Sequence, residues 1–190
     1  IAHRPGFVAP TLAARKLATL DQLTGGRAAV HLIAGGSQAD QAADGDFVDH
    51  DGRYARMAEY VDIMEQSWTA QVPFDVDGAF YKVAGGFSDI RCRQQPRLPV
   101  FGGGGSPAAI AVLAPRVDVF MLWGEPLADT AAFMARVRAA GGARNPVAFS
   151  VSTRPIVGAT QAQAWEKAHA VLEGVTRDDG SDNPRPENAG

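Results

Sequence analysis

Residues 97–126 read RLPVFGGGGSPAAIAVLAPRVDVFMLWGEP and place a short apolar strand, four consecutive glycines, a helix and a second apolar strand in direct succession. Ser106 is a favoured residue for capping a helix, and Pro107 suits the first helical position, where no backbone donor is needed. A strand that leads through a turn into a helix and then into another apolar strand is the repeating unit of parallel α/β sheets. This stretch therefore predicts an α/β fold.

The same alternation continues on both sides of this segment. Short apolar runs predict strands at residues 1–3, 28–34, 99–102, 117–122 and 147–157. Apolar residues at helical spacing predict helices over 10–23, 54–68 and 127–140, and a last helix that contains Trp165 and Leu172. Five strands of this kind define either a doubly wound sheet or part of a β/α barrel.

Two segments depart from this pattern. Residues 72–98 contain β-rich runs on either side of Asp77-Gly78, which predicts a hairpin inserted between two barrel units. Residues 176–190 are polar and rich in Gly and Pro, so we expect a disordered tail. A closed eight-stranded barrel needs about 250 residues, so if residues 1–175 form a β/α barrel, that barrel is incomplete at both ends.

Composition excludes several classes of protein. The 190 residues carry a net charge of −3, which gives no electrostatic basis for binding nucleic acid or an anionic membrane. The single Cys92 excludes internal disulfides, and neither a signal peptide nor an apolar run long enough to span a bilayer is present. Asp49, His50 and Asp51 are too close in sequence for good metal geometry. We expect a cytoplasmic protein without a metal site.

Ligands of parallel α/β folds bind beyond the carboxyl ends of the strands. The residues at or just after those strand ends are His3, Arg4, His31, Ala34, Gly103–Ser106, Trp123 and Arg154. Imidazole, indole and guanidinium groups beside a glycine-rich turn suit an aromatic, phosphorylated cofactor and an anionic substrate. The turn matches neither a P-loop, which needs a following Lys, nor a Rossmann fingerprint, which needs a third spaced glycine.

Each candidate also has a structural interpretation, and the sequence leaves both open. Glycines between a strand and a helix are common turn residues. His31 in an apolar strand can be a core histidine, Trp123 can serve packing alone, and Arg154 can pair with a structural carboxylate.

Several stretches resemble, in the same order, the bacterial luciferase-like flavin-dependent monooxygenases, especially their alkanesulfonate monooxygenase branch. The likeness spans residues 1–175 and is carried by HRPGFVAPTLAARKLATLDQLTGGRAAVHLIAGGS (3–37), FVDHDGRYARMAEYVDIMEQSW (47–68), FGGGGSPAAIAVLA (101–114) and VDVFMLWGEP (117–126). The resemblance implies an eight-stranded β/α barrel that uses reduced FMN, supplied by a separate flavin reductase, and oxygen to oxidise a small-molecule substrate. It also implies a homo-oligomer for the complete barrel.

The resemblance assigns roles to the candidates. It implies that the FMN phosphate is bound by Tyr54, Gly104, Gly105 and Ser106, and that the ring system lies beside His31, Ala34 and Trp123. His31 and Arg154 are the candidate catalytic residues, with Arg154 holding a substrate anion or peroxide. The alkanesulfonate enzymes carry an Arg and a His where this chain has Ser152 and Arg154, so only one cation is kept.

Two alternatives to an FMN-dependent monooxygenase acting on an organosulfur compound remain at this stage. The first is a hydride-transfer oxidoreductase of the same barrel family that uses a deazaflavin or a flavin. The second is an inactive remnant of such an enzyme, since the chain resembles an internal fragment whose first strand-helix units would precede Ile1.

Overall fold

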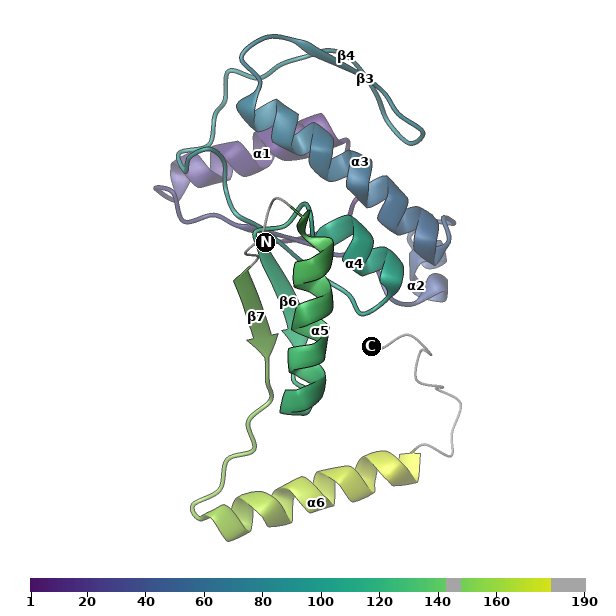
Figure 1. Cartoon of the computed structure of the whole chain (residues 1–190), viewed down its shortest axis with the longest axis vertical. Helices are drawn as coiled ribbons and strands as arrows, with labels where there is room; N and C mark the ends of the chain where they lie inside the picture. Colours follow the sequence, from purple (N-terminus) through teal and green to yellow (C-terminus); the bar gives the residue numbers. More distant parts are fainter. Residues whose placement is uncertain (143–147, 179–190) are drawn as a thin grey trace.

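The computed structural model describes residues 1–142 and 148–178 (Figure 1). One five-stranded sheet is formed by β1 (Ala2–His3), β2 (Val30–Leu32), β5 (Val100–Gly103), β6 (Val119–Trp123) and β7 (Ala148–Ser152), in that order. All neighbouring pairs are parallel. A doubly wound sheet would reverse its strand order at a switch point. The strictly sequential order instead matches the wall of a β/α barrel, which confirms the predicted fold class.

Helices connect these strands and cover one face of the sheet. They are α1 (Pro10–Leu23), α3 (His50–Thr69), α4 (Pro107–Leu113) and α5 (Leu127–Ala140). The two predicted ranges 10–23 and 127–140 are confirmed to the residue. α1 and α3 pack together, and the Trp68 indole N–H donates a hydrogen bond of 2.9 Å to the Ala14 carbonyl.

The strand register divides the sheet residues between two faces. Leu32, Gly102 and Phe120 form one row that is buried beneath the helices. Because side chains alternate along a strand, the neighbouring row, His31, Phe101 and Val119, lies on the opposite face, and these residues are only half-buried. We call this face, which carries no helix in the described chain, the open face.

A hairpin of β3 (Phe74–Asp77) and β4 (Lys82–Gly86) follows α3 and lies apart from the sheet (Figure 1). Its tip is attached to α3 by one side chain. The Glu59 carboxylate accepts backbone N–H bonds from Ala79, Phe80 and Tyr81 at 2.9, 2.9 and 3.1 Å. The predicted hairpin around Asp77-Gly78 is confirmed.

One helix and several boundaries differ from the sequence expectation. The segment expected as a loop before α3 contains a short helix, α2 (Gln38–Ala43), because Ser37 caps it by accepting the Asp40 N–H at 3.2 Å. The runs 28–34 and 147–157 form strands only over Val30–Leu32 and Ala148–Ser152. α6 (Gln161–Asp178) reaches into the segment expected as a tail, and residues 179–190 lie outside the described residues.

Within residues 1–142 and 148–178, no helix is both long and apolar enough to cross a membrane. In the same ranges, no cluster of three or more His, Cys, Asp or Glu side chains could hold a metal ion.

Candidate functional site

The four glycines at the end of β5 and in the turn after it, Gly102–Gly105, serve different purposes. A Cβ at Gly102 would lie 3.0 Å from Leu113 in the core, and one at Gly103 would lie 2.5 Å from the Met121 carbonyl oxygen. These two glycines let the strand pack closely. A Cβ at Gly104 would lie 2.5 Å from Tyr54 Oη and 2.7 Å from Ala109 Cβ. Gly104 has a different role, because its lack of a side chain lets the turn lie against the Tyr54 hydroxyl.

Tyr54 projects from the first turns of α3 toward that glycine. Its side chain is buried, and its ring meets the His50 ring edge-on at 5.1 Å between centroids. Burial raises the pKa of Tyr54, and the nearby Arg53 charge opposes this shift. The hydroxyl therefore keeps its proton at neutral pH, and it makes no hydrogen bond to another described residue. It is free to donate to a ligand.

Ser106 has the predicted capping role. Its Oγ accepts the Ala109 N–H at 3.1 Å, at the start of α4. This bond uses the oxygen as acceptor and leaves the hydroxyl proton available. Gly104, Ser106 and Tyr54 thus form one cradle, in which the contacts of Gly104 with Tyr54 Oη and Ala109 Cβ leave no room for a side chain.

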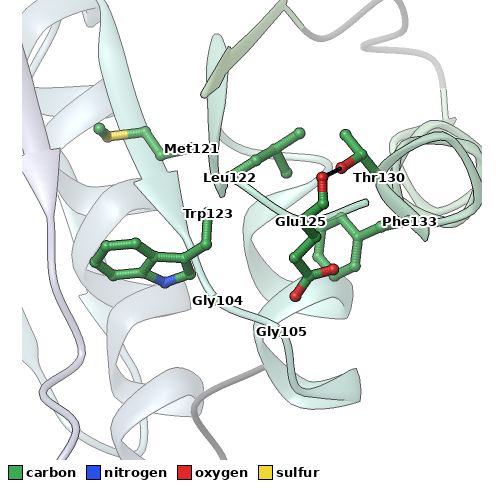
Figure 2. Close-up of a pocket in the computed structure, with 8 residues that line it drawn as sticks. All are labelled: Gly104, Gly105, Met121, Leu122, Trp123, Glu125, Thr130 and Phe133. Carbon is green, nitrogen blue, oxygen red and sulfur yellow. Dashed lines mark hydrogen bonds between the residues drawn. The ribbon is translucent and has the colours of Figure 1, made fainter. Parts of the chain in front are cut away.

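A pocket opens next to this cradle. It is lined by Gly104, Gly105, Met121, Leu122, Trp123, Glu125, Thr130 and Phe133 (Figure 2). The Thr130 hydroxyl donates to the Glu125 carbonyl at 3.3 Å, which holds the turn before α5. The pocket is small, about 30 Å³, and open to solvent. Trp123 lines it and is 67% exposed, so the indole does not serve core packing.

His31 and Ala34 belong to β2 and the residues after it. His31 lies on the open face in register with Phe101, and burial, followed by the Ile1 ammonium, lowers its pKa. The imidazole is therefore neutral at neutral pH. Ala34 packs at the edge of the core two residues beyond β2.

Arg154 does not end a strand, as the sequence indicated, because β7 stops at Ser152. The Gly124 N–H donates to the Ser152 carbonyl at 3.1 Å, which ties the segment before Arg154 to the residue after Trp123. Arg154 is exposed, and no described residue forms an ion pair with it.

Two of the candidates at the strand ends have structural roles. His3 Nε2 lies 2.6 Å from Tyr60 Oη, on the helix side of the sheet. Arg4 forms an ion pair with Asp44 and donates to Gln41 Oε1 at 3.4 Å. None of these contacts involves a residue of the Gly104 cradle.

Sequence reasoning missed Arg53 and the pocket residues of α5. Arg53 is only 2% exposed. A signal for it was present, because Arg53 shares helical spacing with the buried Met57, Tyr60 and Met64 and is therefore a charge on the apolar face of α3. Phe133 carried no such signal, because many apolar residues of α5 share its spacing.

Two features fit a bound phosphate group. The turn exposes the backbone of Gly104 where no side chain could be accommodated, and the Tyr54 hydroxyl lies beside it without a hydrogen bond to a described residue. Glycine backbone and hydroxyl donors are the groups that hold phosphate where no lysine is present.

Comparison with known proteins identifies the family of the chain. The sequence matches the family described as luciferase-like monooxygenase over residues 1–190, and the chain belongs to that family.

Solved structures share the fold at low sequence identity. A riboflavin lyase with modified FMN and riboflavin is 20% identical with a TM-score of 0.79, and covers 90% of this chain and 44% of its own. The EDTA monooxygenase from Chelativorans sp. BNC1 is 21% identical with a TM-score of 0.77, covering 95% and 50%. An F420-dependent secondary alcohol dehydrogenase in complex with an F420–acetone adduct is 19% identical with a TM-score of 0.63, covering 76% and 45%. The chain spans about half the length of these structures.

Proposed function

We propose that this chain carries the flavin site of a monooxygenase that uses reduced FMN and oxygen to oxidise a small organosulfur anion of the alkanesulfonate type. The observation that carries the proposal is the cradle at Gly104, a residue without a side chain that lies against the Tyr54 hydroxyl. Membership of the luciferase-like family supports the choice of a flavin. A separate flavin reductase would supply the reduced cofactor.

The cradle residues would hold the phosphate. Gly104 and Gly105 would present backbone N–H groups at close range, and the hydroxyls of Ser106 and Tyr54 would donate to phosphate oxygens. His31 and Ala34 from β2 and Trp123 from β6 would lie beside the ring system. When bound, reduced FMN would supply the electrons that activate oxygen.

The remaining residues would bind the substrate and exclude water. Phe101, Met121 and Trp123 give the open face an apolar surface next to the pocket. Arg154 is exposed and its charge is not neutralised by a described carboxylate, so it would hold the substrate anion. His31 is neutral because burial lowers its pKa, so it would act as a hydrogen-bonding group.

Binding of reduced FMN, followed by fluorescence quenching, tests this proposal. Ser106→Asp keeps a helix-capping group but places a carboxylate against the phosphate. We expect saturable binding by the unmodified chain and at least about tenfold weaker binding by the variant. Thr160→Asp is the matched control, because Thr160 Oγ1 accepts the Gln163 N–H at 3.3 Å at the start of α6, away from the cradle.

No binding, or equal binding by Ser106→Asp, would contradict the phosphate site. If the chain binds F420 more tightly than FMN in the same titration, the proposed function changes from a monooxygenase to a deazaflavin-dependent oxidoreductase. Oxygen consumption with FMN, a flavin reductase and a series of short alkanesulfonates then tests the substrate class.

A further inference from the structure

The pocket between the Gly104–Gly105 turn and α5 contains one charged side chain, that of Glu125. The other side chains that line it are apolar, apart from the Thr130 hydroxyl and the Trp123 indole N–H. Figure 2 shows the Glu125 carboxylate extending toward the turn of Gly104 and Gly105. A carboxylate next to a site proposed for a phosphate needs an explanation, because two anions repel each other.

Hydrogen bonds on both sides fix the backbone at Glu125. The Gly124 N–H donates to the Ser152 carbonyl at 3.1 Å, and the Glu125 carbonyl accepts the Thr130 hydroxyl at 3.3 Å. Pro126, the capping residue of α5, follows directly, and its ring restricts the backbone further. The Glu125 side chain is therefore attached to a turn whose position is fixed by the neighbouring strand and helix.

The carboxylate itself has no protein partner among the described residues. It forms neither a hydrogen bond nor an ion pair with any of them, and the residue is exposed. Both of its oxygens are thus available to a bound molecule. The exposed Trp123 indole lines the same pocket. A large aromatic surface beside a polar group without a partner is typical of a small-molecule site.

The donors and acceptors of the pocket suit a hydroxyl group better than an anion. The Glu125 carboxylate only accepts hydrogen bonds, whereas the Trp123 indole N–H only donates, and a hydroxyl can do both. Among the described residues that line the pocket there is no Lys, Arg or His to balance a second negative charge. This small, open pocket therefore fits a neutral, hydroxyl-bearing stretch of a larger ligand.

We propose that Glu125 binds the ribityl chain of the flavin by accepting hydrogen bonds from its hydroxyl groups. This inference rests on the proposed function, because it takes a flavin as the ligand. The ribityl chain joins the ring system to the phosphate. The pocket is lined both by Trp123, which is proposed to lie beside the ring, and by Gly105, which is proposed to bind the phosphate. Glu125 recognises the chain between them and does not bind the phosphate.

The test compares reduced riboflavin with reduced lumiflavin, which has the same ring system and lacks the ribityl chain. Neither carries a phosphate, so charge repulsion by Glu125 does not affect the comparison. We expect the unmodified chain to bind riboflavin more tightly than lumiflavin. Glu125→Ala should lower riboflavin affinity about fivefold and leave lumiflavin affinity unchanged. Glu125→Gln keeps an acceptor without the charge, so it should lower riboflavin affinity only about twofold.

Asp129→Ala is the matched control. Asp129 is also an exposed carboxylate, in the first turn of α5, but it does not line the pocket. We expect the same riboflavin-to-lumiflavin affinity ratio in this variant as in the unmodified chain. An equal fall of the ratio in Asp129→Ala and Glu125→Ala would overturn the inference, because the effect would then come from the charge at the start of α5.

The other outcomes separate this inference from the proposed function. If the unmodified chain binds neither FMN nor riboflavin nor lumiflavin, the proposed function is wrong and this inference fails with it. If FMN binds but Glu125→Ala keeps the full riboflavin-to-lumiflavin ratio, only this inference is overturned. A gain in FMN affinity without a loss of riboflavin affinity would also overturn it, because the carboxylate would then only repel the phosphate. Should Glu125→Ala fail to fold, Glu125→Gln carries the test, and an unchanged ratio in that variant overturns the inference.

Discussion

The Tyr54 hydroxyl lies where a side chain at residue 104 would have to be: a Cβ on Gly104 would be 2.5 Å from Tyr54 Oη. This contact joins α3, which follows β2, to the turn that follows β5. Residues separated by fifty positions in sequence therefore form one cradle, and its shape depends on the absence of a single methyl group.

Gly104→Ala should weaken FMN binding at least about tenfold, because the new methyl group displaces the Tyr54 hydroxyl and fills the space for the phosphate. Isothermal titration or fluorescence quenching measures this. Gly36→Ala is the matched control, because a Cβ there meets no atom within 4 Å. Unchanged FMN affinity in Gly104→Ala would show that the phosphate binds elsewhere.

Tyr54→Phe should lower FMN affinity about fivefold and leave riboflavin affinity unchanged, because only the phosphate loses a donor. The hydroxyl makes no hydrogen bond to a described residue, so the free energy of unfolding should change by less than about 0.5 kcal/mol. Paired titrations and urea unfolding measure the two effects. A large loss of stability without a loss of FMN affinity would make Tyr54 a structural residue.

The sequence could predict the parallel sheet and the strand, turn and capped helix around Gly104 because these depend on local signals. Apolar strands, a capping serine and a run of glycines are visible in any short window, as at residues 98–107. The sequence could not show that Gly103 allows close packing against Met121 whereas Gly104 allows close contact with Tyr54. That distinction depends on contacts with β6 and α3. Such tertiary contacts have no local signature.

The ends of strands were predicted less well for a similar reason. The run 147–157 is β-rich throughout, but β7 ends at Ser152 because its partner β6 ends at Trp123. Arg154 therefore lies in a segment that no strand fixes.

Arg154→Gln should raise the KM for an anionic substrate at least about tenfold and leave FMN affinity unchanged, because the guanidinium would bind the substrate and not the cofactor. Initial rates with FMN, a flavin reductase and a short alkanesulfonate measure this. Arg15→Gln, on an exposed position of α1, is the control. A fall in kcat with the KM unchanged would argue for a role in the reaction instead of in substrate binding.

Glu59→Ala should release the tip of the hairpin. Three backbone N–H groups, of Ala79, Phe80 and Tyr81, lose their shared acceptor, and the free energy of unfolding should fall by about 2 kcal/mol. Hydrogen exchange at these amides should accelerate while exchange within α1 is unchanged. If these amides exchange as slowly in Glu59→Ala as in the unmodified chain, other contacts hold the tip of the hairpin.

His3 should make the protein less stable in mild acid. Burial, followed by the Lys16 charge, lowers the pKa of His3 below its ordinary value of 6.5, and burial lowers that of His31 in the same way. The unfolded chain therefore binds more protons than the folded chain below about pH 6.5, so stability falls as the pH drops from about 6.5 through the lowered pKa values.

Burial on the helix side of the sheet gives the physical reason. The pKa of Tyr60 is itself raised by burial, so its hydroxyl keeps its proton, and the hydrogen bond of 2.6 Å between Tyr60 Oη and His3 Nε2 joins two uncharged groups. A charged imidazole in that place would lose hydration without gaining a carboxylate partner. Urea unfolding at several pH values between about 5 and 7.5 measures the slope. His3→Gln should flatten it relative to the unmodified chain, whereas His169→Gln, on an exposed position of α6, should not. An equal slope in His3→Gln would assign the acid sensitivity to His31 or to other groups.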